Sequence, residues 1–344
     1  MKSLRILVLM HESLVPPESI EGMSLKAYDE IKTEFDVVQA LRKAGHEVKP
    51  LGVYDKLADL RAMIAEWKPD IVFNLLEEFQ GIAAYDQHVV AYLELLRQPY
   101  TGCNPRGLMI SRDKVLSKQI LTYHRIPTPQ FAVFRKDRRY RIPKKLKYPL
   151  FVKSTTEDAS LGISQASIVH DAAKLKERIE FIHEQTNSDA LVEEYIEGRE
   201  LYVGVLGNDQ LKTFPVWELE FGSLGQVQSA IATRRVKWDR TYQDKHGIKP
   251  QAAPGLTDAQ HAYLEKLSKR IYRALGLSGY ARMDFRFRPD GTAFCLEANA
   301  NPNLSHDEDF AQSALSMGIK FDELLERLVR LGLNYQAAWR MTEV

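Results

Sequence analysis

Two carboxylates near the end of the chain lie in a pattern that predicts a cation site. The stretch MDFRFRPDGTAFCLEANANPN, residues 283–303, alternates apolar and polar residues on both sides of a Pro-Asp-Gly sequence. Such alternation about a turn is typical of two antiparallel strands in a hairpin. A turn at 289–292 predicts three facing pairs: Asp284 with Glu297, Phe285 with Leu296, and Phe287 with Phe294. Like charges that face each other repel, and a bound cation is the simplest compensation.

The polar face of this hairpin offers the ligands that such a cation needs. We expect this face to carry Asp284, Arg286, Glu297 and Asn299. Hard cations such as Mg²⁺ prefer carboxylate and amide oxygens. No His or Cys accompanies them at ligand spacing, which argues against zinc. An alternative that these residues leave open is a surface ribbon whose acids pair with nearby arginines, namely Arg282, Arg286 or Arg288.

A lysine at the end of an apolar run predicts a phosphate site. Lys153 ends the run YPLFVK, and small and hydroxylated residues follow it from Ser154 to Gly162. Such a loop brings backbone N–H groups close to phosphates, while the lysine supplies positive charge. The stretch does not match a Walker P-loop. Alone, the pattern is weak, because a lysine at a strand end beside a Ser/Thr loop is usually just solvated.

A third stretch, LVEEYIEGREL, has features of an adenosine site. An apolar strand ends in residues 193–196, where an extended backbone has groups able to bind the edge of adenine. Glu200 follows and could accept a hydrogen bond from a ribose hydroxyl. The alternative is a strand end with exposed acids. Together, however, the three stretches supply what nucleotide chemistry needs.

The elements that position these residues follow from hydrophobic periodicity. In the first hundred residues we expect strands at 4–10, 46–52 and 69–75, with helices at 28–44 and 57–67 between them. This alternation predicts a small doubly wound parallel sheet, whose ligands bind at the carboxyl ends of its strands, here residues 11–21 and 74–80.

The rest of the chain predicts two further modules with antiparallel strands. We expect a helix at 112–123, strands at 131–134, 148–155 and 164–169, a helix at 171–185 and a strand at 189–196. Strands at 199–207 and 210–219, a helix at 257–275, the hairpin and a helix at 321–331 complete the chain. The basic stretch 135–148 is more typical of a solvated connector than of a nucleic-acid site.

Composition limits the function classes. The 344 residues include 47 basic and 46 acidic side chains, so the near-zero net charge gives no sign of a nucleic-acid or membrane partner. Cys103 and Cys295 stand far apart and predict no disulfide or metal site. We interpret the apolar residues 4–10 as a buried strand and not a signal peptide, and no apolar run reaches membrane-spanning length. These features predict a cytoplasmic protein.

The stretches quoted above, together with the segment that follows Pro99, resemble in chain order the motifs of ATP-grasp carboxylate–amine ligases, and specifically the D-alanine–D-alanine ligase branch. The resemblance runs from about Pro99 through QPYTGCNPRGLMISRDKVLSKQIL and PLFVKSTTEDASLGIS to ARMDFRF and CLEANANPN. It implies an ATP-grasp fold with ATP held between two sheets. The implied division is an N-terminal α/β domain at 1–110, a central lid domain at 111–196 and a catalytic domain at 197–344.

The resemblance also implies roles for individual residues. Lys114 and Lys153 would bind ATP, Arg282 would stabilise the reacting carboxyl group, and Ser160 in the mobile loop would join Lys153 and Arg282 in catalysis. Two Mg²⁺ ions, or Mn²⁺, would be held by Asp284, Glu297 and Asn299. Further ATP contacts are implied at Glu193, Glu194, Tyr195, Ile196, Glu200, Lys237 and Leu296. Related ligases are often dimers, so a homodimer is also expected as one option.

The loops expected to bind substrates depart from the D-alanine–D-alanine ligase pattern. MHESLVPPESIEG and NLLEEFQGIAAYDQH stand where that branch has its dipeptide-specific loops, and Glu308 stands where it has a serine that holds the acceptor's carboxylate. An acid there would repel such a carboxylate, so we expect a nucleophile other than D-alanine. Alternatively, these acids merely favour the dipole of the next helix. The candidate substrate residues are Glu12, Glu78, Asn303, Ser305 and Glu308.

Three functions remain open on the sequence. The first is an ATP- and Mg²⁺-dependent ligase that joins a small amino-acid-like carboxylate to an amine through an acylphosphate. The second keeps the ATP site but modifies a peptide or protein tail. The third is a nucleotide-binding regulatory module without turnover. The joint presence of the candidate lysines, Arg282 and metal ligands counts against the third.

Overall fold

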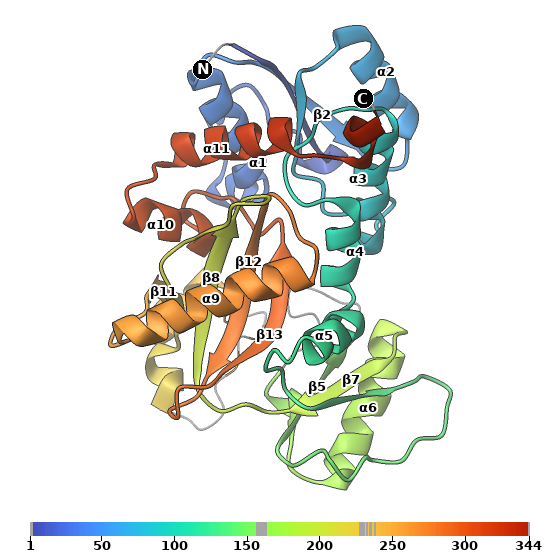
Figure 1. Ribbon diagram of the computed structural model, residues 1–344, viewed down its shortest axis with the longest axis vertical. Helices are drawn as coiled ribbons and strands as arrows, with labels where there is room; N and C mark the ends of the chain where they lie inside the picture. Colours follow the sequence, from blue (N-terminus) through green and yellow to red (C-terminus); the bar gives the residue numbers. More distant parts are fainter. Residues whose placement is uncertain are drawn as a thin grey trace.

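Three β-sheets lie one beyond another along the length of the molecule (Figure 1). The computed structural model describes residues 3–155, 164–226, 231, 233, 236 and 239–342. The first sheet is parallel and the other two are antiparallel, which confirms the predicted α/β class with α+β character in the later modules. Each sheet lies within one of the three predicted segments, whose boundaries stay predictions.

The N-terminal sheet has the strand order β2-β1-β3. Its strands are β1 (Arg5–His11), β2 (Glu47–Val53) and β3 (Ile71–Asn74), and its helices are α1 (Leu25–Lys43), α2 (Leu57–Trp67) and α3 (Asp86–Leu95). Strand β1 is central and its interior residues are buried, which explains its unbroken apolar run. Helix α1 begins earlier than predicted because the Ser24 side chain accepts a hydrogen bond from the Ala27 amide and caps it.

The helix predicted at 112–123 is confirmed with a start two residues later, but a second helix directly before it was not predicted. Two helices occupy this region, α4 (Pro105–Arg112) and α5 (Lys114–Tyr123). Asp113 between them has a non-helical backbone, and its carboxylate accepts hydrogen bonds from the amides of Val115 and Leu116. The aspartate therefore acts as an N-cap that starts a new helix.

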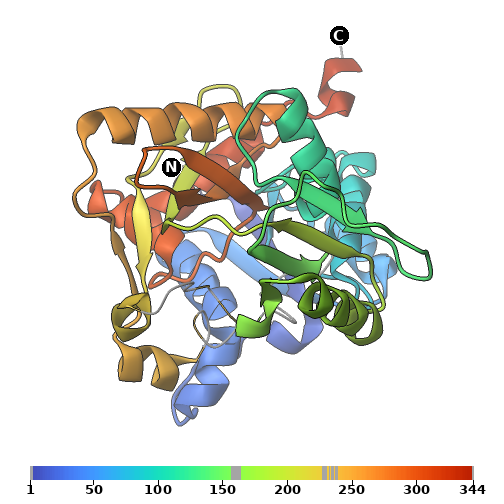
Figure 2. The same ribbon diagram turned by 90° about the horizontal axis from the view of Figure 1, so that it is seen from below.

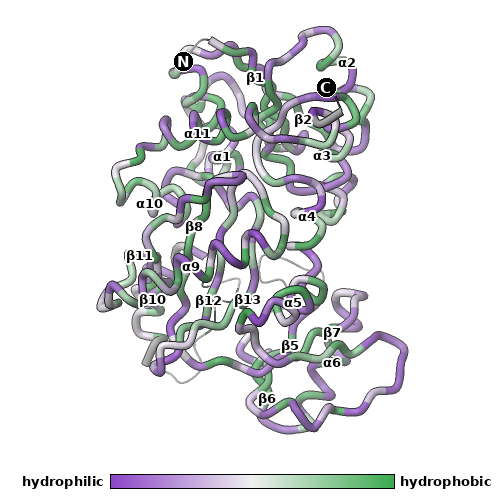
Figure 3. Tube along the Cα trace, in the orientation of Figure 1, coloured by the Kyte–Doolittle hydropathy of each residue, from purple (hydrophilic) through white to green (hydrophobic). Residues whose placement is uncertain are grey.

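The four-stranded sheet has the order β4-β7-β5-β6. It comprises β4 (Phe131–Phe134), β5 (Leu150–Ser154), β6 (Ile168–Val169) and β7 (Ala190–Glu194), with helix α6 (Ala172–Thr186) packed on it. The predicted strand at 164–169 is shorter than expected because a 3₁₀ turn, Gln165–Ser167, precedes β6. Residues 135–148, which we call the basic connector, are mostly exposed and hydrophilic (Figure 3).

The six-stranded sheet carries the predicted hairpin. Its main path is β11-β10-β8-β12-β13, and β9 pairs with β8. The strands are β8 (Arg199–Leu206), β9 (Lys212–Thr213), β10 (Trp217–Glu220), β11 (Lys249–Ala252), β12 (Tyr280–Phe287) and β13 (Ala293–Ala300), with helices α8 (Arg240–His246) and α9 (Asp258–Ala274). Helix α9 runs along the outside of this sheet (Figure 2) and shares its core with Met283 and Phe285. Side chains at alternate positions of β12 therefore point to the opposite face.

The hairpin register is partly as predicted. Asp284 pairs directly with Glu297, as expected, but a β-bulge follows and shifts the remaining pairs. Phe285 lies opposite Cys295 and Phe287 opposite Ala293, so the two predicted phenylalanine pairs are wrong. Leu296 is the extra residue of the bulge, a feature that sequence alternation does not reveal.

The C-terminal helices return to the N-terminal sheet. Helices α10 (Asp309–Ser316) and α11 (Phe321–Asn334) share one apolar core with β1, β3 and α1. Leu324, Leu325 and Leu328 lie in this core beside Ile6 and Phe73. Across the residues that the structure describes, helices long and apolar enough to cross a membrane are absent.

Candidate functional site

The polar face of β12 holds a network of buried charges. Asp284 is 2% exposed, and Arg282 donates to both of its carboxylate oxygens, from Nε at 2.7 Å and from Nη2 at 2.9 Å. Nη1 of the same arginine donates to Asp309 of α10 at 2.8 Å. The arginine also lies over the ring of Tyr202 on β8, at 4.6 Å. Arg282 is thus fixed by three groups from three elements.

These acids keep Arg282 charged. Burial acts to lower the pKa of its guanidinium, but Asp284 and Asp309 outweigh burial and raise the pKa well above its usual value. The alternative in which the hairpin acids pair with nearby arginines is therefore confirmed for one acid, Asp284, which pairs with Arg282. Arg286 instead pairs with Glu200 at 2.9 Å, and Arg288 with Asp290 at 3.6 Å.

The oxygen ligands of this face fit a Mg²⁺ ion that also binds phosphate. Asp284 and Glu297 are cross-strand partners, and the Asn299 amide donates to Asp284 at 3.0 Å, so the three side chains are neighbours. Within the described residues no cluster of three or more His, Cys, Asp or Glu could hold a metal. Two carboxylates and an amide nevertheless suit Mg²⁺, which usually completes its octahedron with phosphate oxygens and water. Asp284, Glu297 and Asn299 would hold such an ion, which would supply charge neutralisation to a bound phosphate.

Two lysines of the four-stranded module meet one buried glutamate. Glu193, at 2% exposure, forms two ion pairs: Lys153 of β5 lies 2.9 Å from its Oε1, and Lys118 of α5 lies 2.8 Å from its Oε2. Lys118 also donates to the hydroxyl of Thr128 at 3.1 Å. That hydroxyl in turn donates to the carbonyl of Cys295 on β13 at 3.1 Å. The cluster therefore connects the four-stranded sheet to the strand that carries Glu297.

The charges in this cluster affect one another. Burial acts to raise the pKa of Glu193, but Lys118 and Lys153 outweigh it and lower the pKa. Burial lowers the pKa of Lys118 in spite of Glu193. Burial also acts to lower the pKa of Lys153, but Glu193 and then Glu297 raise it overall. The two lysines differ because only Lys153 also feels the carboxylate of Glu297 strongly.

The opposite end of the site joins α1 to the segment after β13. Lys32 forms an ion pair with Asp307, a residue 275 positions later in the chain. The hydroxyl of Thr33 donates to Asn303 at 3.0 Å and lies 2.7 Å from that of Ser305. These contacts hold the segment 303–307 against the N-terminal module. The predicted substrate residues Asn303 and Ser305 therefore lie together.

This end of the site is rich in acids. Glu308 is the N-cap residue of α10, but its side chain does not cap the helix; its backbone N–H donates to the Ser305 carbonyl at 3.0 Å. Burial, Asp309 and Asp307 together raise its pKa to about 7. Glu34, next to Thr33 on α1, is 7% exposed, and burial raises its pKa to about 7 as well.

Comparison with known proteins adds a family to this geometry. The family described as "D-ala D-ala ligase C-terminus" matches residues 120–330. The D-alanine–D-alanine ligase of Syntrophotalea carbinolica is 31% identical, and the match covers 90% of this chain and 92% of that relative. An uncharacterized protein of Sinorhizobium fredii, y4sG, is 34% identical over 85% of each chain.

The chain belongs to the D-alanine–D-alanine ligase family. Its fold is the ATP-grasp fold: the crystal structure of the D-alanine–D-alanine ligase from Bacillus anthracis superposes with a TM-score of 0.76 at 25% identity, over 99% of this chain and 100% of that one. The structure of that enzyme complexed with ATP gives a TM-score of 0.73 at 24% identity. Members of this family are ATP-dependent ligases that form C–N bonds, and this chain is one of them.

The ATP residues predicted for this ligase have varied surroundings. Glu200 is buried and is held by the Tyr202 hydroxyl and Arg286. Glu194 accepts from the Lys147 amide through its side chain, and the Tyr195 amide donates to Pro149. Tyr195 lies 5.7 Å from the guanidinium of Arg286. Ile196 follows directly in the chain, and Leu296 occupies the bulge beside Glu297.

Other predicted residues of the ligase lie apart or cannot be placed. Lys114 is buried at the start of α5, one helical turn from Lys118. Ser160 and Lys237 lie outside the described residues. At the carboxyl end of β1, Glu12 is exposed, and Glu78 lies 3.5 Å from His11. Lys118 was missed by sequence reasoning, although its position four residues after Lys114 places both lysines on one helix face.

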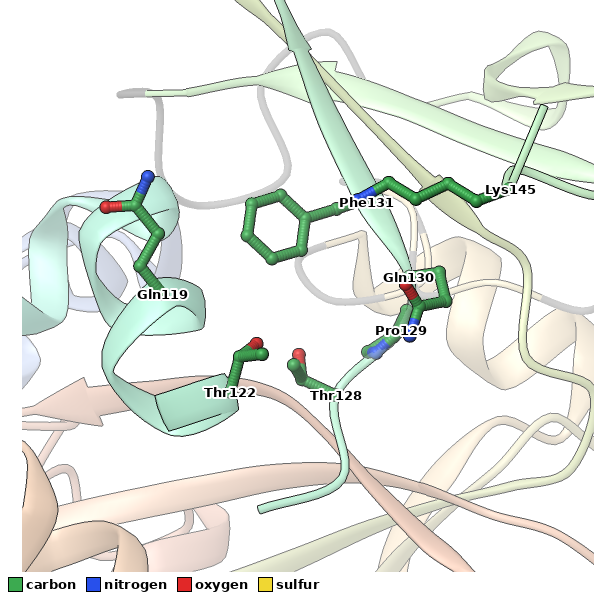
Figure 4. A pocket seen from close by; sticks show the side chains of 7 residues that line it. All are labelled: Gln119, Thr122, Thr128, Pro129, Gln130, Phe131 and Lys145. Atoms are coloured by element: carbon green, nitrogen blue, oxygen red, sulfur yellow. The ribbon is translucent and has the colours of Figure 1, made fainter. Parts of the chain in front are cut away.

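A separate cavity of about 250 Å³ lies beside the Lys118 helix (Figure 4). Gln119 and Thr122 of α5 line one side, and Thr128 and Phe131 line the other. The cavity is thus distinct from the acidic hairpin face, although Thr128 borders both it and the lysine cluster.

Proposed function

We propose that this ligase uses ATP and Mg²⁺ to join a small amino-acid-like carboxylate to an amine other than D-alanine. The main support is the position of Arg282, which lies between the oxygen ligands Asp284 and Asn299 and the acids of α10. The predicted phosphate side of the site is cationic and its predicted acceptor side is acidic. The proposal assigns ATP to the first side and the amine to the second.

The chemistry proceeds in two steps. An oxygen of the substrate carboxylate attacks the γ-phosphorus, and the bond to the bridging oxygen of ADP breaks, which gives an acylphosphate and ADP. The amine nitrogen then attacks the acyl carbon, phosphate leaves, and the nitrogen loses a proton to give the amide. Arg282 is placed to stabilise the negative charge that develops on the carbonyl oxygen.

The nucleotide is assigned to the lysine cluster and the hairpin face. Lys153 would bind the phosphates, and residues 193–196 with Glu200 would bind adenosine. Mg²⁺, when bound, neutralises charge between the terminal phosphates, and Asp284, Glu297 and Asn299 would hold it. We retain two ions as the prediction, with Mn²⁺ as a substitute.

The charge of the acceptor side supports a nucleophile without a free carboxylate. Asp307 is neutralised by Lys32, and Arg282 faces both Asp284 and Asp309, so its single charge is already balanced. Glu308 adds a further acid, on which burial, Asp309 and Asp307 outweigh the attraction of Arg282 and Lys32. A carboxylate on the acceptor would be repelled there, whereas an uncharged or cationic group would be accommodated.

The test is ADP release from ATP with a panel of amino acids, amines and dipeptides, each omitted in turn. We expect release only when a carboxylate and an amine are both present, and loss of release when EDTA removes Mg²⁺. Preference for D-alanine as acceptor would refute the proposed specificity. Turnover only with a peptide would favour the tail-modifying function, and nucleotide binding without any turnover would refute the ligase proposal.

A further inference from the structure

Lys118 is buried in a position that the proposed chemistry leaves unexplained. Its side chain is 2% exposed, and it binds a carboxylate oxygen of Glu193 other than the one that binds Lys153. Burying an ammonium group is costly unless it is paired and hydrogen-bonded, and here Glu193 and Thr128 supply both partners. A lysine in such a place needs a reason beyond packing.

The shared carboxylate weakens the hold of Glu193 on Lys153. A carboxylate that pairs with two ammonium groups divides its charge between them. With one ammonium partner, its full charge would attract that partner. Two lysines and one glutamate also leave the cluster with one surplus positive charge. That surplus lies beside Glu297, whose carboxylate contributes to the raised pKa of Lys153.

We propose that Lys118 is a positioning residue of the nucleotide site, which occupies one oxygen of Glu193 so that Lys153 can transfer from the other oxygen to the terminal phosphates of ATP. After the transfer Glu193 keeps Lys118 as its counterion, so no buried carboxylate is left unpaired. This inference rests on the proposed function and names a residue that sequence motifs do not select.

The connection to β13 makes Lys118 suited to this role. Its second partner, Thr128, bonds to the carbonyl of Cys295, and the Cys295 amide donates to the carbonyl of Pro127 at 2.9 Å. The linker between α5 and β4 is therefore attached to the strand that carries Glu297. Lys118 stays in place relative to that strand while Lys153 changes partner.

The test compares Lys118→Met with Lys153→Met and with the double variant Lys118→Met/Glu193→Gln. In Lys118→Met the whole carboxylate holds Lys153, so we expect KM for ATP to rise about tenfold to 100-fold. The inhibition constant of AMP, which lacks the terminal phosphates, should change less than about twofold. In the double variant the surplus positive charge returns and KM for ATP should recover to within about threefold of wild type.

Controls separate this inference from folding and from the proposed function. Lys176→Met, at an exposed lysine of α6, should leave KM unchanged, and thermal unfolding should report the fold of every variant. An unchanged KM in folded Lys118→Met, beside a raised KM in Lys153→Met, would overturn the inference and leave the ligase function intact. If Lys118→Met does not fold, the double variant decides: a KM as high as that of Lys153→Met refutes the inference. Absence of ADP release from wild type would instead refute the proposed function.

Discussion

The two ends of the site differ in the sign of their charge and in how closely they follow the family motifs. At the predicted nucleotide end, Lys118 and Lys153 outnumber the single glutamate between them. At the predicted acceptor end, acids outnumber bases, and the influence of burial, Asp309 and Asp307 on Glu308 exceeds that of Arg282 and Lys32. The family resemblance is strong at the first end and weak at the second. Under the proposed function, the phosphate-binding part of the enzyme follows the family, and the acceptor differs where the charge changes sign.

Arg282 lies where these two ends meet, and altering it should have the largest effect. Lysine in its place keeps one charge but loses the forked contact with Asp284 and the reach to Asp309. For Arg282→Lys we expect kcat to fall roughly 10²- to 10³-fold, because the developing oxyanion loses a preorganised donor. Steady-state ADP release measures this.

Arg288→Lys is the matched control for that experiment. Arg288 lies on the same hairpin but is exposed, and its side chain forms an ion pair with Asp290. Its replacement should leave kcat within about twofold, as is usual for exposed ion pairs. If Arg282→Lys has the same kcat as wild type, Arg282 does not stabilise the reacting group, and the two ends of the site do not meet at this residue.

Removing the acid that sets the acceptor end apart should have an intermediate effect. In Glu308→Ser the repulsion of an acceptor carboxylate is relieved, so kcat/KM for D-alanine, relative to an amine without a carboxylate, should rise about tenfold to 100-fold. Competition between the two acceptors measures the ratio.

The control for Glu308 is Glu323→Ser on α11. Glu323 also lies at the start of a helix but pairs with Arg327 on the surface. Its replacement should not change acceptor preference. An unchanged preference in Glu308→Ser would mean that the acid merely favours the helix dipole and does not select the substrate.

The smallest effect is expected on stability and not on turnover. Burial raises the pKa of Glu34 from 4.5 to about 7, so between these values the folded chain binds a proton that the unfolded chain has lost. The free energy of unfolding should therefore fall as pH rises through this range and level off above it. Glu34→Gln should remove the Glu34 part of this dependence, leaving that of Glu308, and gain on the order of 2 kcal/mol relative to wild type between pH 5 and pH 8.

Urea unfolding at the two pH values measures this difference. Glu30→Gln, at an exposed glutamate of the same helix, is the control and should follow wild type at both. Identical pH profiles for wild type and Glu34→Gln would show that burial does not raise the pKa of Glu34.

Much of the fold and part of the site could be predicted from the sequence. Period-two alternation identified the hairpin and the facing of Asp284 and Glu297, since strand geometry alone sets them. The shifted pairs after Asp284 could not be predicted, because a bulge depends on tertiary packing. Asp113 was missed as an N-cap because periodicity continues on both sides of it.

The structure was also needed to decide which lysine of α5, Lys114 or Lys118, pairs with Glu193. Both lie on one face of α5, and only the positions of β5 and β7 show which one meets Glu193. The contacts of Lys32 with Asp307 and of Thr33 with Asn303 join distant parts of the chain, and no local pattern predicts such pairs. Sequence reasoning is thus strongest for residues that share an element and weakest for residues that different modules bring together.

The return of α11 to the first sheet has a consequence for synthesis on the ribosome. Leu324, Leu325 and Leu328 cover apolar side chains of β1 and β3, strands that were translated roughly 250 to 320 residues earlier. Until those leucines emerge, one side of the oldest sheet stays uncovered, so the nascent chain is open to chaperones for most of its translation. Completion of the N-terminal module is then among the last events, and an arrested or truncated chain that lacks α11 should be recognised as unfinished.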